Sequence, residues 1–378
     1  MTSIPLAVPQ LTGNESRYVQ ECLDSGFVSS VGPFVERFER EFAAAVGARH
    51  AVACASGTAA LHVALQLSGA APGRVVAVSD FTFIASANAI RYTGAEPLLV
   101  DSEPATWNLD TARLHDEVVR RARRGLPLPA VIEVVHVLGH PADVEPLLDL
   151  RARFGIRLVE DAAEALGATY RAGPLAGRWV GTVGDVGCFS FNGNKIITTG
   201  GGGMIVTDDA DTAARARHLT TQAKTPGVGY VHDEVGYNYR LTNVAAALGV
   251  AQLEQLPAFI AAKRRIAARY RQALEGVVAS AVPAAPWAAP SHWLASVLLR
   301  DDAPPLTAVL QRLAAEGVQA RPLWPPLHQQ APYRDAARLG GAVGDDLYAR
   351  GLSLPSSVGL TDDEQDHVVA AVVAALER

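Results

Sequence analysis

Lysine is rare in this chain, and its rarity draws attention to one residue. Of the 33 basic residues in the 378-residue sequence only three are lysine, namely Lys195, Lys224 and Lys263. Arginine therefore carries the ordinary surface charge, and a lysine suggests what arginine cannot do, which is to lose a proton and act as an amine nucleophile. Lys263, within the helical pattern AAKRRIAARYRQAL, and Lys224, within QAKTPG, are expected on the surface. Lys195 remains as the candidate nucleophile.

Several other residues that suit a ligand stand directly after short apolar runs. They are Ser56-Gly57-Thr58, Asp80-Phe81-Thr82-Phe83, His136, Glu160-Asp161, and Ser190 with Asn192, Asn194 and Lys195 beyond it. If the apolar runs are parallel strands, these residues meet at the carboxyl edge of one sheet, where ligands bind. The helix that begins at Ser56 would offer free N–H groups to a phosphate, although Ser before a helix is usually only a cap.

Each of these features has an ordinary reading when it is taken alone. Asp161 could ligate a metal, cap a helix or join an ion pair, and Phe83 could belong to the core. Together, a phosphate cradle, a carboxylate, an aromatic ring and an isolated lysine are what pyridoxal 5′-phosphate requires. The carboxylate keeps the pyridine nitrogen protonated, the aromatic ring stacks on the pyridine, and the lysine carries the cofactor. The combination predicts a pyridoxal phosphate enzyme.

Competing motifs are weaker. The run Gly200–Gly203 lacks the GK[ST] ending of a phosphate-binding P-loop, and no GxGxxG follows the first apolar run. His136 and His140 are four residues apart, but HVLGHP contains Gly and Pro where a zinc-binding helix would need HExxH. We therefore expect neither a nicotinamide cofactor nor a metal.

Hydrophobic periodicity alternates between short runs and helical patterns, as in an α/β layer fold. Strands are expected at 51–53, 74–78, 97–100, 130–135, 156–159, 186–191 and 203–207, with a helix at 33–46 before them and helices at 55–67, 82–93 and 142–154 between them. This predicts a mostly parallel, seven-stranded sheet in a large domain at 1–243. A smaller α/β domain at 244–378 would begin with one long helix at 244–277 and end with a helix at 361–377.

Composition excludes several classes of protein. The chain is 49% hydrophobic and 19% charged with a net charge of −6, which excludes intrinsic disorder and gives no basic field for nucleic acid. The opening MTSIPLAVPQ has no signal-peptide pattern, no run is long enough for a membrane helix, and three cysteines without CxxC spacing do not suggest disulfides. A cytoplasmic protein that does not bind membranes is expected.

With these residues in view, the chain resembles the DegT/DnrJ/EryC1/StrS nucleotide-sugar aminotransferases, from about Val8 to the C-terminus. The resemblance is carried by GFVSSVGPFVERFEREFA (26–43), ASGTAALHVAL (55–65), DFTFIASANAIRYTGAEPLLVD (80–101), VEDAAEALGATY (159–170), GDVGCFSFNGNKIITTGGGGMIVTDD (184–209) and DEVGYNYRLTNVAAALGVAQLE (233–254). It implies the aspartate aminotransferase type I fold of pyridoxal phosphate enzymes.

The resemblance also implies a role for each matching residue. Lys195 would form the Schiff base and Asp161 would pair with the pyridine nitrogen. Phe83 would stack on the ring, and the phosphate would be held by Gly57, Thr58 and Ser190. Glu164 stands where other branches carry Gln or His near the cofactor's 3-hydroxyl, so whether it donates or accepts is open. Asn238, in GYNYRLT, would reach the phosphate in the other subunit, which implies a homodimer with shared active sites.

The branch of the family is a separate question. FNGNKIITTGGGGM and the opening VPQLTGNE most resemble aminotransferases acting at C4 of a UDP-linked 2-acetamido-2,6-dideoxy-4-ketohexose, of the bacillosamine and legionaminic-acid type, in cell-surface polysaccharide biosynthesis. Glu164 is shared with GDP-perosamine synthases, which are the first alternative. A keto-cyclitol aminotransferase and a non-catalytic, cofactor-binding regulator are further alternatives.

The implied reaction is a ping-pong transamination with L-glutamate as the amino donor. In it, Lys195 moves a proton between the donor carbon and the cofactor. The nucleotide diphosphate calls for cationic or forked donors, and three residues are candidates for that role: Arg240, Arg321 and His328.

Overall fold

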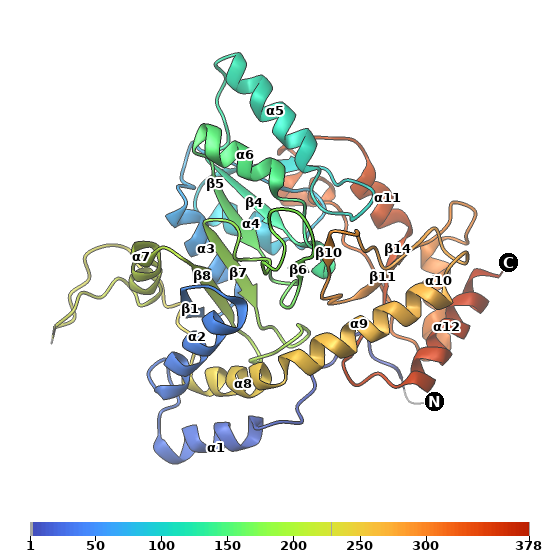
Figure 1. Cartoon of the computed structure of the whole chain (residues 1–378), viewed down its shortest axis with the longest axis horizontal. Coiled ribbons are helices and arrows are strands. Elements are labelled where there is room, and N and C mark those ends of the chain that lie inside the picture. The colour runs from blue at the N-terminus through green and yellow to red at the C-terminus, as the bar shows by residue number, and fades with distance from the viewer. Residues whose placement is uncertain (1–2, 228, 378) are drawn as a thin grey trace.

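The computed structural model describes residues 3–227 and 229–377. Its centre is a sheet of eight strands in the order β1-β8-β7-β5-β4-β2-β3-β13 (Figure 1). The strands are β1 (His50–Cys54), β2 (Val75–Ser79), β3 (Glu96–Val100), β4 (Val131–Val135), β5 (Arg157–Asp161), β7 (Val186–Ser190), β8 (Gly203–Thr207) and β13 (Ala337–Leu339). Only β8 runs antiparallel to its neighbours. The expected α/β fold with a mostly parallel sheet is confirmed, and β13 adds an eighth strand to the seven expected.

Helices precede, separate and follow the strands of the large domain. They are α1 (Glu15–Ser25), α2 (Pro33–Val46), α3 (Gly57–Leu67), α4 (Ala85–Tyr92), α5 (Thr111–Arg123), α6 (Glu145–Phe154), α7 (Ala210–Thr220) and α8 (Asn243–Glu254). Local sequence explains their ends. Pro33 occupies the first turn of α2, and Gly47 ends that helix in the left-handed conformation, with φ 76°. Helix α3 packs on β5, β7 and β8, so its first turn lies over the carboxyl end of the sheet.

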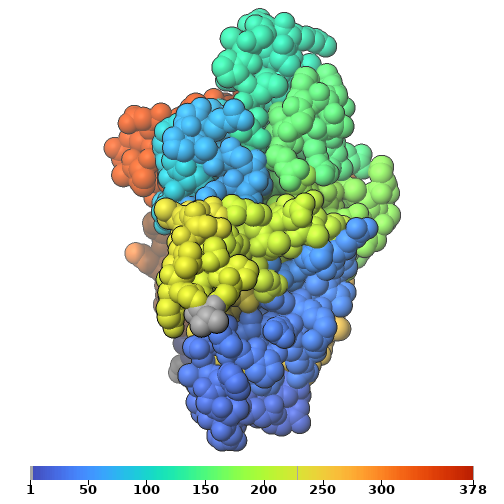
Figure 2. All heavy atoms as spheres, turned by 90° about the vertical axis from the view of Figure 1, so that its left-hand side faces the viewer, coloured from blue at the N-terminus to red at the C-terminus, as the bar shows by residue number. Residues whose placement is uncertain are grey.

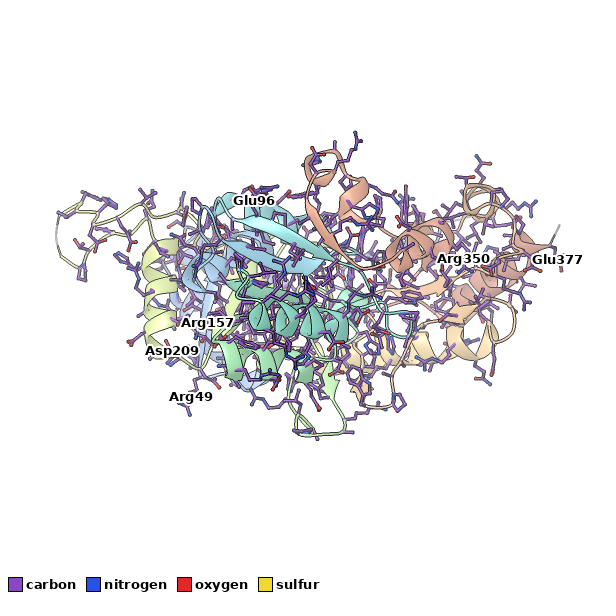
Figure 3. The ribbon with its side chains drawn as sticks, turned by 90° about the horizontal axis from the view of Figure 1, so that it is seen from above. Arg49, Glu96, Arg157, Asp209, Arg350 and Glu377 are labelled. Atoms are coloured by element: carbon purple, nitrogen blue, oxygen red, sulfur yellow. The ribbon has the colours of Figure 1, made fainter. Side chains whose placement is uncertain are left out.

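The small domain has its own sheet and its own core. An antiparallel sheet in the order β12-β14-β11-β9 comprises β9 (Ser280–Ala281), β11 (Ala295–Leu298), β12 (Arg321–Pro322) and β14 (Gly351–Leu354). Around it lie α9 (Leu256–Ala273), α10 (Leu306–Ala315), α11 (Val343–Arg350) and α12 (Asp362–Leu376), while β6 (Thr169–Tyr170) pairs with β10 (Ala288–Ala289) elsewhere. Ile4 bridges to Val318, which places the N-terminal segment in this domain. Figure 3 shows Arg350 and Glu377 at this end of the molecule and Arg49 and Asp209 at the other.

The single helix expected at 244–277 is wrong. The chain forms two helices, α8 and α9, whose axes differ by 63°. Pro257 lies in the first turn of α9, where its missing N–H is tolerated but would interrupt a continuous helix. Among the described residues no single helix is long and apolar enough to cross a membrane, and only the bent α8–α9 pair passes that test, by length and composition.

Part of the C-terminal region returns to the large domain. Strand β13 extends the large sheet by pairing in parallel with β3. Leu327, Tyr333 and Leu347 are buried in the large core together with the residues of the first half of the chain. The region expected to form the small domain, 244–378, therefore contributes both α8 and the segment around β13 to the large domain. Turn-rich stretches such as RPLWPPLHQQAPY carry no periodicity from which this pairing could be predicted.

Candidate active site

A pocket of about 260 Å³ opens at the carboxyl edge of the large sheet. It is lined by seven of the residues singled out in the sequence: Gly57, Thr58, Phe83, Asp161, Glu164, Ser190 and Lys195. They come from four segments of the chain, each at the end of a strand, after one or at the start of a helix. These residues lie together at one edge of the sheet, as expected.

Lys195 lies in the loop after β7 with its amine inside the pocket. Its Nζ is 3.7 Å from Oε1 of Glu164 and 3.9 Å from the centre of the Trp293 ring. Burial lowers the pKa of the Lys195 amine below its ordinary value, and the negative charge of Glu164 opposes this effect. A lysine with a lowered pKa is easier to convert to the neutral amine that attacks carbonyl groups.

Asp161 ends β5, and both of its carboxylate oxygens are held in place. Oδ2 accepts a hydrogen bond from Ser86 Oγ at 2.8 Å, and Oδ1 accepts one from the Ala163 N–H at 3.0 Å. Burial raises the pKa of Asp161, and the hydrogen bond from Ser86 opposes this. A buried carboxylate of this kind is stabilised by a cation placed against it, and the protonated ring nitrogen of pyridoxal phosphate is such a cation.

The start of α3 and the end of β7 form a close-fitting cradle. Ser56 Oγ caps the helix by accepting the Ala59 N–H at 3.0 Å, and the N–H groups of Gly57 and Thr58 precede that bond in the same first turn. A Cβ on Gly57 would lie 2.8 Å from Cβ of Ser190, so only glycine allows the helix and strand to approach so closely. The N–H groups and nearby hydroxyls of Thr58 and Ser190 suit a phosphate, and the site as a whole fits the predicted cofactor.

Glu164 is the second carboxyl group of the pocket, and it faces the lysine. Its Oε2 accepts the backbone N–H of Leu138 at 2.8 Å, which leaves Oε1 directed at Lys195. Leu138, the donor of this bond, has φ 54°, a conformation that a leucine rarely adopts. Burial raises the pKa of Glu164 to about 7, while the charge of Lys195 lowers it. Glu164 can therefore change its protonation state near neutral pH at a distance of 3.7 Å from the Lys195 amine.

Aromatic side chains form the wall and the mouth of the pocket. Phe83 is 54% exposed, so it is not the core residue that its type alone suggests. Trp293 and Trp324 stack on one another at 6.3 Å and line the same pocket. Sequence reasoning missed both tryptophans as site residues, and it also missed Ser86. Trp324 lies between Arg321 and His328, two candidates for the nucleotide diphosphate, and this position was the one available signal.

The structure keeps the four remaining candidate residues outside the pocket lining. Arg240 donates to Glu39 Oε1 at 2.8 Å, and His328 Nδ1 lies 2.6 Å from Asp80 Oδ2. Arg321 is exposed on β12, and Asn238 bridges to Thr221 at the base of a segment that projects from the large domain, at the left of Figure 1. Their proposed roles toward substrate or partner remain predictions.

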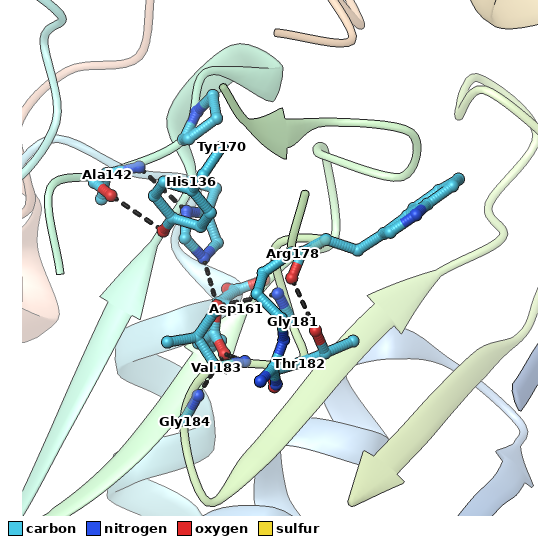
Figure 4. A network of polar contacts seen from close by, with 12 residues as sticks. His136, Ala142, Asp161, Tyr170, Arg178, Gly181, Thr182, Val183 and Gly184 are labelled. Carbon is cyan, nitrogen blue, oxygen red and sulfur yellow. Dashed lines mark hydrogen bonds and ion pairs between the residues drawn. The ribbon is translucent and has the colours of Figure 1, made fainter. Parts of the chain in front are cut away.

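His136, at the end of β4, serves the fold beneath the site (Figure 4). Its Nδ1 accepts the Ala142 N–H at 3.0 Å, so Nε2 carries the proton and donates to Glu160 Oε2 at 2.9 Å. Glu160 also accepts backbone N–H groups of the following loop, from Gly181 and Val183 at 2.7 Å each. Both ring nitrogens of His136 are thereby occupied by structural hydrogen bonds.

Comparison with known proteins agrees with this geometry. The DegT/DnrJ/EryC1/StrS aminotransferase family model matches residues 9–373. The chain is 41% identical to GDP-perosamine synthase of Caulobacter vibrioides, over 98% of this chain and 97% of that protein. It is 37% identical to GDP-perosamine synthase of Escherichia coli O157:H7, over 98% of each. The crystal structure of the aminotransferase TlmJ from Streptoalloteichus hindustanus superposes with a TM-score of 0.88 at 30% identity, covering 99% of this chain and 98% of that one.

Proposed function

The chain belongs to the DegT/DnrJ/EryC1/StrS aminotransferase family and is a pyridoxal phosphate-dependent sugar-nucleotide aminotransferase, and we propose that it aminates the C4 ketone of a nucleotide-linked 4-keto-6-deoxysugar with L-glutamate as donor. The observation that carries the proposal is the placement of the Lys195 amine between Glu164 and Trp293, in the pocket that also holds Asp161. An amine in this position can both carry the cofactor and move a proton.

Pyridoxal phosphate supplies an aldehyde carbon and a ring that accepts electrons. The chain supplies everything else. The first turn of α3 and Ser190 would hold the phosphate, Asp161 would keep the ring nitrogen protonated, and Phe83 would cover the ring. Glu164 would take a proton from the Lys195 ammonium, which would leave the Lys195 amine neutral and able to take up and release a proton beside the reacting carbon. The tryptophan wall limits the access of water.

For the nucleotide, we propose GDP first. The two GDP-perosamine synthases, at 41% and 37% identity over nearly the whole chain, support a GDP-linked 4-keto-6-deoxymannose. The second candidate is the UDP-linked 2-acetamido-2,6-dideoxy-4-ketohexose, which is supported by the resemblance of the segment around Lys195. Both substrates present a C4 ketone and a C6 methyl group on the neighbouring C5, so the reacting part of the pocket serves either.

We further propose that the protein acts as a homodimer in the cytoplasm. The projecting segment that ends at Asn238 exposes apolar side chains, among them Tyr230 at 88% and Val235 at 79%, and Figure 2 views the face from which it extends. Apolar side chains exposed to this degree are typical of a surface that contacts another chain. The three cysteines are free, as in proteins of a reducing compartment.

The test is an absorbance titration of the protein loaded with pyridoxal phosphate. L-glutamate should abolish the yellow band of the lysine-bound cofactor, and a GDP-linked 4-keto-6-deoxysugar should restore it. Restoration by the UDP-linked sugar alone would replace the first candidate by the second. A band that glutamate leaves unchanged would contradict the proposed donor, and the Lys195→Arg variant, which keeps the charge but loses the nucleophile, is the control that should show no such cycle.

A further inference from the structure

Lys263, which was expected on the surface, is buried in the middle of α9. Its side chain is 3% exposed, and its Nζ donates to the carbonyl oxygen of Trp293 at 2.9 Å and to that of Ser356. Within residues 3–227 and 229–377 it has no carboxylate partner. A buried lysine without a counter-charge is costly, so its presence calls for a function.

The two acceptors match a neutral amine better than an ammonium group. An ammonium group carries three protons, whereas a neutral amine has two N–H groups, one for each of the two carbonyl oxygens. Burial lowers the pKa of Lys263 to about 7, in agreement with this count. What the side chain contributes is therefore two hydrogen bonds at a fixed place, and only secondarily a charge.

The carbonyl that Lys263 holds belongs to the tryptophan beside the reactive lysine. The Trp293 ring lies 3.9 Å from Lys195 Nζ, and its Nε1 donates to the carbonyl oxygen of Asn194 at 2.6 Å. The preceding residue, His292, has φ 53°, so the backbone turns sharply before it presents the Trp293 carbonyl to α9. A continuous set of contacts thus runs from Lys263 through Trp293 to Lys195 and its neighbour.

We propose that Lys263 is a positioning residue for the active site, which fixes Trp293 and through it the amine of Lys195. The proposal rests on the proposed function only in taking Lys195 as the amine that binds the cofactor. Two other cations of α9 bind residues of the chain that precedes Trp293, none of which lines the pocket. Arg264 donates to the carbonyls of Ala289 and Pro290, and Arg271 donates to that of Val282. Substituting one of these arginines would weaken the attachment of this part of the chain to α9 while leaving the bond to Trp293 in place. Such a variant therefore separates general attachment from the placement of Trp293.

The experiment uses the protein labelled with 5-fluorotryptophan, which gives one ¹⁹F resonance for each of its five tryptophans. Trp293→Phe assigns the resonance of Trp293. Lys263→Met should shift or broaden that resonance and slow the capture of added pyridoxal phosphate by Lys195 about tenfold, the size expected for a sub-ångström displacement of a reacting group. Lys263→Gln, which keeps N–H donors but cannot be charged, should recover most of the capture rate. Arg271→Met should change neither readout.

A double-mutant comparison tests whether Lys263 acts on Lys195 through Trp293. Trp293→Phe should slow capture on its own, and Lys263→Met added to it should slow capture no further. Independent, multiplicative effects of the two substitutions would overturn the proposal, as would an unchanged Trp293 resonance in Lys263→Met. If that variant does not fold, an unchanged capture rate in Trp293→Phe overturns it instead. Neither readout involves a sugar, so an error in the proposed sugar substrate does not affect this test. Failure of wild-type Lys195 to capture the cofactor would count against the proposed function only.

Discussion

Glu133, in the middle of β4, should reduce the stability of the protein increasingly as the pH rises. Its side chain is fully buried, and neither carboxyl oxygen has a hydrogen-bond partner among the described residues. Burial raises the pKa of Glu133 well above its ordinary value of 4.5, with a smaller contribution from the charge of Asp161. The folded state therefore keeps this carboxyl protonated, whereas the unfolded chain releases the proton.

The sign and size of the effect follow from proton linkage. Below the pKa that this carboxyl has in the unfolded chain, the group is protonated in both states and does not lower the free energy of unfolding. Above about pH 4.5 the free energy of unfolding falls by about 1.4 kcal/mol for each pH unit, until the raised pKa of the folded state is reached. At about pH 6.5, two units above the ordinary value of 4.5, Glu133 should lower the free energy of unfolding by about 3 kcal/mol relative to a neutral residue of the same shape.

Glu133→Gln supplies that neutral residue. Unfolding of the variant and the wild type by guanidinium chloride should be compared at pH 5 and pH 6.5, with the same protein concentration and pyridoxal phosphate content. The advantage of the variant should grow by about 2 kcal/mol between the two pH values. Glu275→Gln, at an exposed position, is the control and should show no such growth. If the free energies of unfolding of Glu133→Gln and wild type differ by the same amount at both pH values, the pKa of Glu133 is not raised in the folded state.

Three predictions concern the site. Gly57→Ala would place a Cβ 2.8 Å from Cβ of Ser190, so the affinity for pyridoxal phosphate, measured by titration, should fall about tenfold; an unchanged affinity would contradict the cradle. Asp161→Asn should retain the cofactor but lower kcat with L-glutamate about 100-fold, and a normal kcat would exclude its role at the ring nitrogen. Because Glu164 is protonated below its pKa of about 7, capture of pyridoxal phosphate by Lys195 should slow as the pH falls through 7. Glu164→Gln should remove that pH dependence, and its persistence would assign it to another group.

The residues that follow strands were the part of the site that sequence could predict. Asp161, Ser190 and Lys195 come directly after apolar runs, and parallel strands bring such positions to one edge. Ser86 and Trp293 carry no such marker. Ser86 lies inside α4, Trp293 lies in the small domain, and only tertiary packing brings them to Asp161 and Lys195.

Charged residues were the least predictable. Arg240 and His328 suit a diphosphate by type, but Glu39 and Asp80 engage them from segments about 200 or more residues away, and no local pattern announces those pairs. Lys263 was misplaced for a related reason. Its neighbours Arg264 and Arg265 made the helix look solvated, whereas the bend at Pro257 turns the Lys263 position toward the core. The bend itself could have been predicted from the proline.

The most direct test of the account is to locate the cofactor on the chain. Borohydride reduction of the loaded protein fixes the cofactor to whichever amine holds it, and mass spectrometry of the peptides distinguishes the three lysines. We expect a label on Lys195, and loss of that label when L-glutamate is added before reduction. A label on Lys224 or Lys263, or one on Lys195 that L-glutamate does not remove, would contradict it.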